Sequence, residues 1–75
     1  MIPLSVLDAA KGLIEMFGNT LYLKGNYQGK VVYQYVFPLN MSTGYPFLYI
    51  YDKQSNTTTE VTGFESLEII EQLEL

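Results

Sequence analysis

The spacing of apolar residues changes along the chain, and each change marks a different structural element. Between Ser5 and Phe17, apolar residues recur every three or four positions, which is the period of an amphipathic helix. Ser5 and Asp8 have the three-residue spacing of a capping box, and Gly18 with Asn19 tolerates the left-handed backbone on which helices often end. We therefore predict a helix over residues 5–17.

From Thr20 onward, apolar and polar residues alternate, which is the period of a β-strand. Residues that favour strands, namely β-branched and aromatic ones, concentrate in three further segments at 31–37, 47–51 and 57–61. The segment 38–46 is the longest predicted loop, because proline at its start cannot donate to a sheet ladder. Either Gly25–Asn26 or Gly29–Lys30 has the turn chemistry to close the first hairpin.

The last part of the chain returns to helical spacing. Thr62 and Glu65 form a second possible capping box. The apolar side of this helix consists of Leu67, Ile69, Ile70 and Leu73, and glutamates occupy the other side. The predicted order is α-β-β-β-β-α, so we expect one small α+β domain over residues 1–75, with an antiparallel sheet of three or four strands.

The strands are apolar on both faces, whereas a half-solvated strand would alternate apolar and polar residues. In 31–37 and 47–51, aromatic residues occupy one set of alternate positions, and mainly aliphatic residues occupy the other set. The first strand sorts similarly, because Leu21 and Leu23 alternate with Tyr22. The sequence thus predicts an aliphatic face and an aromatic face. The predicted aromatic face consists of Tyr22, Tyr33, Tyr35, Phe37, Phe47, Tyr49 and Tyr51.

The simplest packing places both helices on the aliphatic face, since one face of a four-stranded sheet accommodates about two helices. The aromatic face would then point outward and expose roughly 500–900 Å², more than monomers usually leave uncovered. The aromatic face could be covered in three ways: by a second copy of the chain, by another molecule, or by one of the helices if one lies on each face. The first is favoured, because a short chain buries little surface on its own. We therefore expect a homodimer.

Composition and charge exclude several classes of function. The chain has 75 residues and no cysteine, histidine, tryptophan or arginine, so the usual general base and the commonest metal ligands are missing. The net charge is −4, and residues 60–75 contain five acids and no lysine. Such a surface repels nucleic acids and anionic membranes. No stretch reaches the length of a membrane span.

The motifs of catalysis and cofactor binding are also missing. The oxygen-rich spacing at 52–60 suggests a calcium loop, but Thr57 stands where the loop needs glycine and Gly63 where it needs glutamate. The glycines form no phosphate-binding pattern. The glutamates of the last helix are typical of a solvated face, with docking of a basic partner as the alternative. We expect no enzymatic activity, no metal and no cofactor.

A leading helix, a meander and the Tyr-Asp-Lys-Gln-Ser-Asn turn before a threonine-rich strand resemble PepSY-type modules over residues 5–62. The resemblance implies an extracytoplasmic inhibitory or binding unit. The main expectation from the residues themselves is a non-enzymatic module that self-associates through the aromatic face. The alternative is a domain that binds a saccharide, a peptide or another small ligand on the same face. A complete chain would be cytoplasmic, whereas a chain that has lost its leader could be periplasmic.

Overall fold

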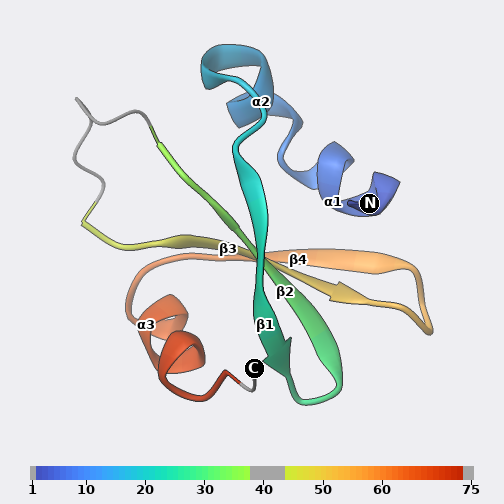
Figure 1. Ribbon diagram of the computed structural model, residues 1–75, viewed down its shortest axis with the longest axis vertical. Helices are drawn as coiled ribbons and strands as arrows, with labels where there is room; N and C mark the ends of the chain where they lie inside the picture. The colour runs from blue at the N-terminus through green and yellow to red at the C-terminus, as the bar shows by residue number, and fades with distance from the viewer. Residues whose placement is uncertain (1, 38–43, 74–75) are drawn as a thin grey trace.

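The computed structural model describes residues 2–37 and 44–73, and it has the predicted α+β architecture. The elements are α1 (Leu4–Ala9), α2 (Lys11–Phe17), β1 (Leu21–Tyr27), β2 (Lys30–Tyr35), β3 (Phe47–Asp52), β4 (Thr57–Val61) and α3 (Phe64–Glu71). The strands form one antiparallel sheet in the order β1-β2-β3-β4 (Figure 1). The predicted element order is therefore confirmed, and most of the predicted loop 38–46 lies outside the described residues.

The predicted first helix is divided into two at Ala10. This residue has φ −96° and ψ 9°, and the chain changes direction there (Figure 1). Val6 and Ala10 are both buried against the sheet, so the bend allows the segment to follow the twisted surface beneath it. The predicted capping role of Ser5 is wrong, because the helix begins one residue earlier. The Ser5 hydroxyl instead lies 2.7 Å from the Thr58 hydroxyl on β4.

The cap of α3 also differs from the prediction. Gly63, with φ 75°, occupies the N-cap position that we predicted for Thr62. No side chain caps this helix, but the Ser66 hydroxyl donates a hydrogen bond to the Gly63 carbonyl at 2.6 Å. Ser66 is completely buried, so this bond satisfies a hydroxyl that would otherwise be costly to bury.

The first hairpin is closed by Gln28 and Gly29, which have φ values of 50° and 78°. Positive φ at both central residues is the geometry of a two-residue hairpin turn that matches the strand twist. Of the two predicted turns, Gly25–Asn26 is wrong, since both residues lie inside β1, and Gly29–Lys30 is displaced by one residue, since Lys30 begins β2. A β-bulge falls between Leu23 and Gly25, so the extra residue there is Lys24.

The register confirms the aromatic face for β2 and β3. Tyr33 lies opposite Tyr49, and Tyr35 lies opposite Phe47. For β1 the prediction is wrong, because the hairpin pairs Leu21 with Tyr35 and Leu23 with Tyr33. The two leucines therefore share the aromatic face. Tyr22 pairs with Gln34 and points to the aliphatic face, where its hydroxyl donates to the Gln34 side-chain oxygen at 2.9 Å.

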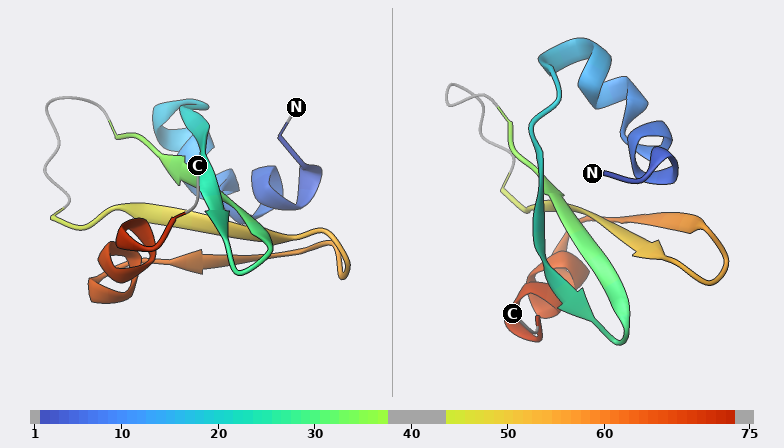
Figure 2. Two further views of the ribbon diagram at one scale, coloured as in Figure 1. Left: turned by 60° about the horizontal axis from the view of Figure 1, so that its bottom comes forward. Right: turned by 45° about the vertical axis from the view of Figure 1, so that its right-hand side comes forward.

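The helices lie on opposite faces of the sheet, so the expectation that both cover the aliphatic face is wrong (Figure 2). Val6 and Ala10 pack in one cluster with the buried tyrosines of the aromatic face. Ile69 of α3 packs in a second cluster with aliphatic residues, including Val32 and Leu48. The sheet is so twisted that the β1–β2 hairpin crosses β3 and β4 in Figure 1. Both apolar faces of this twisted sheet thus receive a helical cover within one chain.

Candidate functional site

The residues predicted to form an exposed aromatic interface are mostly inside the protein. Tyr33, Tyr35 and Tyr49 are exposed by only 9%, 2% and 0%. The other members of that face, Phe37, Phe47 and Tyr51, are partly buried and pack against the same cluster. The estimate of a large uncovered patch is therefore wrong, because it assumed that no helix lies over these rings. The aromatic face is core, and it does not offer a broad stacking platform to a saccharide or peptide.

The tyrosine hydroxyls of this face hold the surrounding elements in place. The Tyr35 hydroxyl lies 2.6 Å from the Gly18 carbonyl and 3.0 Å from the Leu13 carbonyl, so it can donate its proton to either. The Tyr49 hydroxyl donates to the Glu60 carboxylate at 2.6 Å. Burial, and then this bond, raises the pKa of Tyr49 well above its ordinary value near 10. Both phenols therefore have structural partners, and Tyr49 remains protonated at neutral pH.

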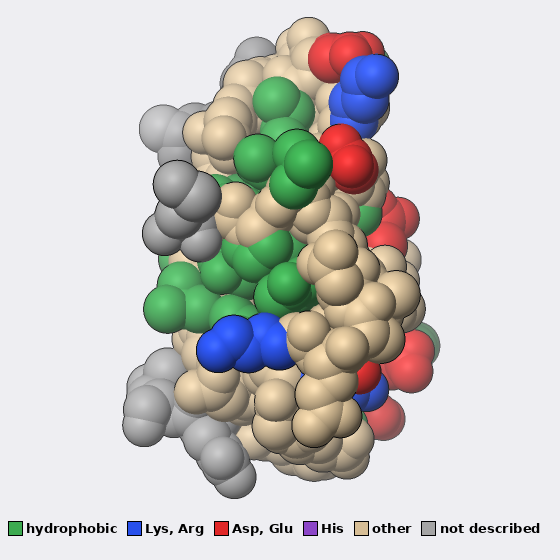
Figure 3. All heavy atoms as spheres, turned by 90° about the vertical axis from the view of Figure 1, so that its right-hand side faces the viewer, with side chains coloured by type: hydrophobic (Ala, Val, Ile, Leu, Met, Phe, Trp, Pro, Cys, Tyr) green, Lys and Arg blue, Asp and Glu red, His purple; other side chains and the backbone are tan. Residues whose placement is uncertain are grey.

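A smaller apolar surface remains at the free edge of the sheet, and the sequence analysis did not identify it. Strand β1 ends the sheet, and Leu23 on its aromatic-face side is 63% exposed. Tyr22 on the opposite side is 40% exposed, and the Lys24 ammonium lies 5.8 Å from the centre of its ring. Apolar side chains also gather on the side of the molecule that carries α1 and the β3–β4 turn (Figure 3). We call Tyr22, Leu23 and Lys24 the β1 edge.

A second exposed apolar group lies where α3 begins. Phe64 is 74% exposed, and its ring centre lies 5.3 Å from that of Tyr45, which is 36% exposed. Leu67, one helical turn beyond Phe64, is 40% exposed. We call Tyr45, Phe64 and Leu67 the α3 patch. The glutamate pattern of this helix was visible in the sequence, but the position of Tyr45 depends on tertiary structure.

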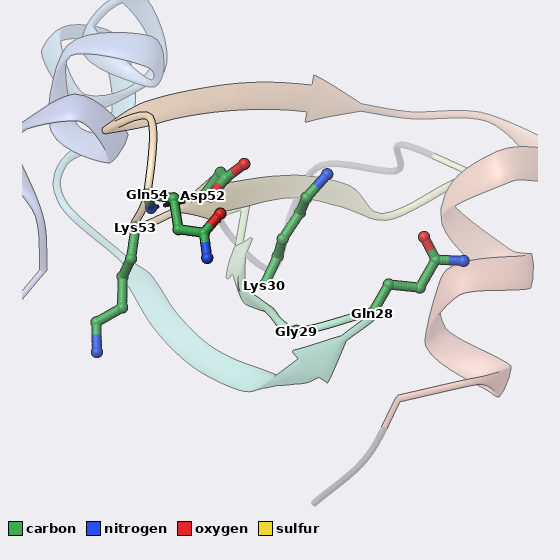
Figure 4. A pocket seen from close by; sticks show the side chains of 6 residues that line it. All are labelled: Gln28, Gly29, Lys30, Asp52, Lys53 and Gln54. Carbon is green, nitrogen blue, oxygen red and sulfur yellow. Dashed lines mark hydrogen bonds between the residues drawn. The ribbon is translucent and has the colours of Figure 1, made fainter.

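The turns of the two hairpins form a polar hollow of about 310 Å³ (Figure 4). Its lining consists of Gln28, Gly29, Lys30, Asp52, Lys53 and Gln54. Figure 4 shows the Lys30 side chain extending between the turns, whereas the Lys53 side chain points away from the hollow. The Asp52 carboxylate already accepts a hydrogen bond from the backbone N–H of Gln54 at 3.0 Å. The hollow is open and no aromatic or aliphatic residue is among its lining residues, so its geometry does not define a ligand.

Metal and membrane sites find no support in the part of the chain that the structure describes. Within residues 2–37 and 44–73, no three acidic, histidine or cysteine side chains gather as a metal site would require. None of the described helices is long and apolar enough to cross a membrane. Comparison with protein-family models, curated proteins and solved structures finds no match for this chain. The resemblance to PepSY-type modules therefore gains no support from these comparisons.

Proposed function

We propose that the chain is a non-enzymatic interaction domain that self-associates by pairing the β1 edge of two copies. The observation that carries this proposal is the 63% exposure of Leu23 on a strand that ends the sheet. An edge strand presents free backbone N–H and C=O groups, which a strand from another chain can pair with. Apolar side chains next to such an edge add buried area when pairing occurs.

The opposite edge of the sheet supports the choice of β1. Strand β4 carries threonines and Glu60, and the Ser5–Thr58 hydrogen bond joins it to α1. A polar edge with a helix packed beside it is poorly suited to pairing. On β1, the corresponding protection that the described residues provide is Lys24 and the bulge that contains it. Two copies would therefore meet around Leu23, in the first half of β1.

Charge favours one register for an antiparallel pair of β1 strands. With Leu23 opposite Leu23 of the second copy, the two leucines meet at the symmetry axis. Tyr22 then lies opposite Lys24, so the contact between an ammonium and a phenol ring is repeated across the interface. A register centred on Lys24 would place two like charges opposite one another, which destabilises a strand pair.

Sedimentation equilibrium over a range reaching hundreds of micromolar tests the proposal. We expect a reversible dimer for the wild type and a monomer for Leu23→Lys, because the register would bring the two new ammonium groups together. Leu4→Lys is the matched control, since Leu4 is 72% exposed and lies on α1. A wild-type protein that stays monomeric throughout overturns the proposal. A dimer that both variants retain also overturns it, because another surface must then form the interface.

A further inference from the structure

We propose that the α3 patch is a docking site for a basic, amphipathic segment of another protein. This inference does not rest on self-association, because it concerns a different face of the molecule. The patch begins with Phe64, the most exposed aromatic side chain among the described residues. Because Phe64 is 74% exposed, its side chain contributes much less to folding stability than that of Ile69 on the same helix, which is 5% exposed.

The apolar centre of the patch is continuous. Tyr45 and Phe64 are in contact through rings tilted by 56°, and Leu67 follows Phe64 on the same flank of α3. Together the three side chains expose roughly 300 Å², which is the scale of functional patches on monomeric proteins. This area fits one or two apolar anchors of a short segment, and it is too small for a stable globular interface.

The charge around the patch identifies the chemistry of the occupant. Each apolar side chain of the patch on α3 has a glutamate one helical turn further on: Glu68 follows Phe64, and Glu71 follows Leu67. Both glutamates and Glu65 are exposed, and no lysine lies between residues 60 and 73. A segment that places lysine or arginine beside its apolar anchors complements both the apolar side chains of the patch and the glutamates around them. An acidic segment with the same anchors would be repelled.

The small contact area predicts a weak complex, with a dissociation constant in the range of about 1 μM to 1 mM. Electrostatic attraction at exposed charges is screened by salt, so the affinity should fall as ionic strength rises. Apolar contact with Phe64 should persist at high salt. The two contributions can therefore be separated experimentally.

The probe is a short amphipathic peptide of lysine and leucine, titrated into ¹⁵N-labelled protein and followed by amide chemical shifts. We expect saturable shifts concentrated in α3 and around Tyr45. Phe64→Ser should weaken binding at least about tenfold, because it removes the largest anchor. Met16→Ser is the matched control, since Met16 is 73% exposed on α2, and it should bind as the wild type does.

Two further measurements make each part of the inference refutable. The triple variant Glu65→Gln, Glu68→Gln, Glu71→Gln should weaken binding and lose most of its salt dependence. A peptide with glutamate in place of lysine should not bind. Equal losses in Phe64→Ser and Met16→Ser, or shifts spread over the whole sheet, would overturn the assigned site. Binding that is unaffected by the triple variant would overturn the basic character of the partner. The Leu23→Lys variant should bind the peptide as the wild type does, because Leu23 lies outside the α3 patch. This test is therefore separate from the test of self-association.

Discussion

The Tyr35 hydroxyl lies 2.6 Å from the carbonyl oxygen of Gly18, the residue that ends α2. This bond joins β2, an inner strand of the sheet, to the residue directly after the N-terminal helical segment. The Tyr35 ring is 2% exposed, so its polar end has a partner inside the protein. The relationship explains why an aromatic sheet face can serve as core: its rings pack under α1 and α2, and its hydroxyls bond to the chain that covers them.

Replacing Tyr35 with phenylalanine should lower the free energy of unfolding by about 1–2 kcal/mol, because the hydroxyl and its carbonyl partners lose a partly buried hydrogen bond. Urea denaturation measures the loss. Tyr22→Phe is the control, since its bond to Gln34 is exposed and should be worth less than about 0.5 kcal/mol. Equal stabilities of the two variants would contradict the anchoring role of Tyr35.

The pair Tyr49 and Glu60 predicts a particular response to alkaline pH. Burial and the carboxylate raise the pKa of Tyr49 in the folded protein above its unfolded value near 10, so the folded state binds this proton more tightly. The stabilising contribution is therefore complete below about pH 10 and is lost as pH rises through the folded pKa. Tyr49→Phe should lower stability at neutral pH by about 1–2 kcal/mol and reduce the alkaline loss.

Urea midpoints of wild type, Tyr49→Phe and Tyr22→Phe at about pH 7 and about pH 11 check this prediction. The difference between wild type and Tyr49→Phe should narrow at the higher pH, and Tyr22→Phe should follow the wild type. A constant difference at both pH values would show that the Tyr49 phenol does not contribute through linkage.

The two apolar clusters should contribute to stability independently, since the sheet separates them. Val6→Ala, in the aromatic cluster, should cost about 2 kcal/mol, and Ile69→Val, in the aliphatic cluster, about 0.5–1.5 kcal/mol. In the double variant these losses should add to within about 0.5 kcal/mol, as expected for sites without shared partners. A coupling well above that value would indicate that α1 and α3 share one core.

Periodicity predicted the strands well because each strand carries its own signal. The predicted segment 57–61 coincides with β4, and the segments 31–37 and 47–51 overlap β2 and β3. The same alternation also assigned the faces of β2 and β3. It failed for β1, because alternation does not set the phase of one strand relative to the next. That phase is changed by the bulge at Lys24: with the turn at Gln28 and Gly29 alone, Tyr22 would lie opposite Tyr35, and the extra residue moves it opposite Gln34.

The position of the helices was beyond sequence reasoning for a related reason. Helical spacing shows that Val6 and Ile69 face a core, but it does not say which face of the sheet that core occupies. The β1 edge was not predicted, because the alternation of residues predicts that Leu23 is buried. Only the strand order shows that β1 lies at an edge of the sheet. The acidic side of α3 was recognised, whereas the contact of Phe64 with Tyr45 brings together residues from two separate elements.

The proposed pairing of two β1 edges is tested most directly by an engineered disulfide, because the chain contains no cysteine. Directly opposite residues of antiparallel strands have Cα atoms about 4.5–5.5 Å apart, within the span of a disulfide. Under mild oxidation, Leu23→Cys should form a covalent dimer rapidly, whereas Met16→Cys, exposed to a similar degree, should remain monomeric. Equal rates of cross-linking in the two variants, or none in Leu23→Cys, would contradict the pairing.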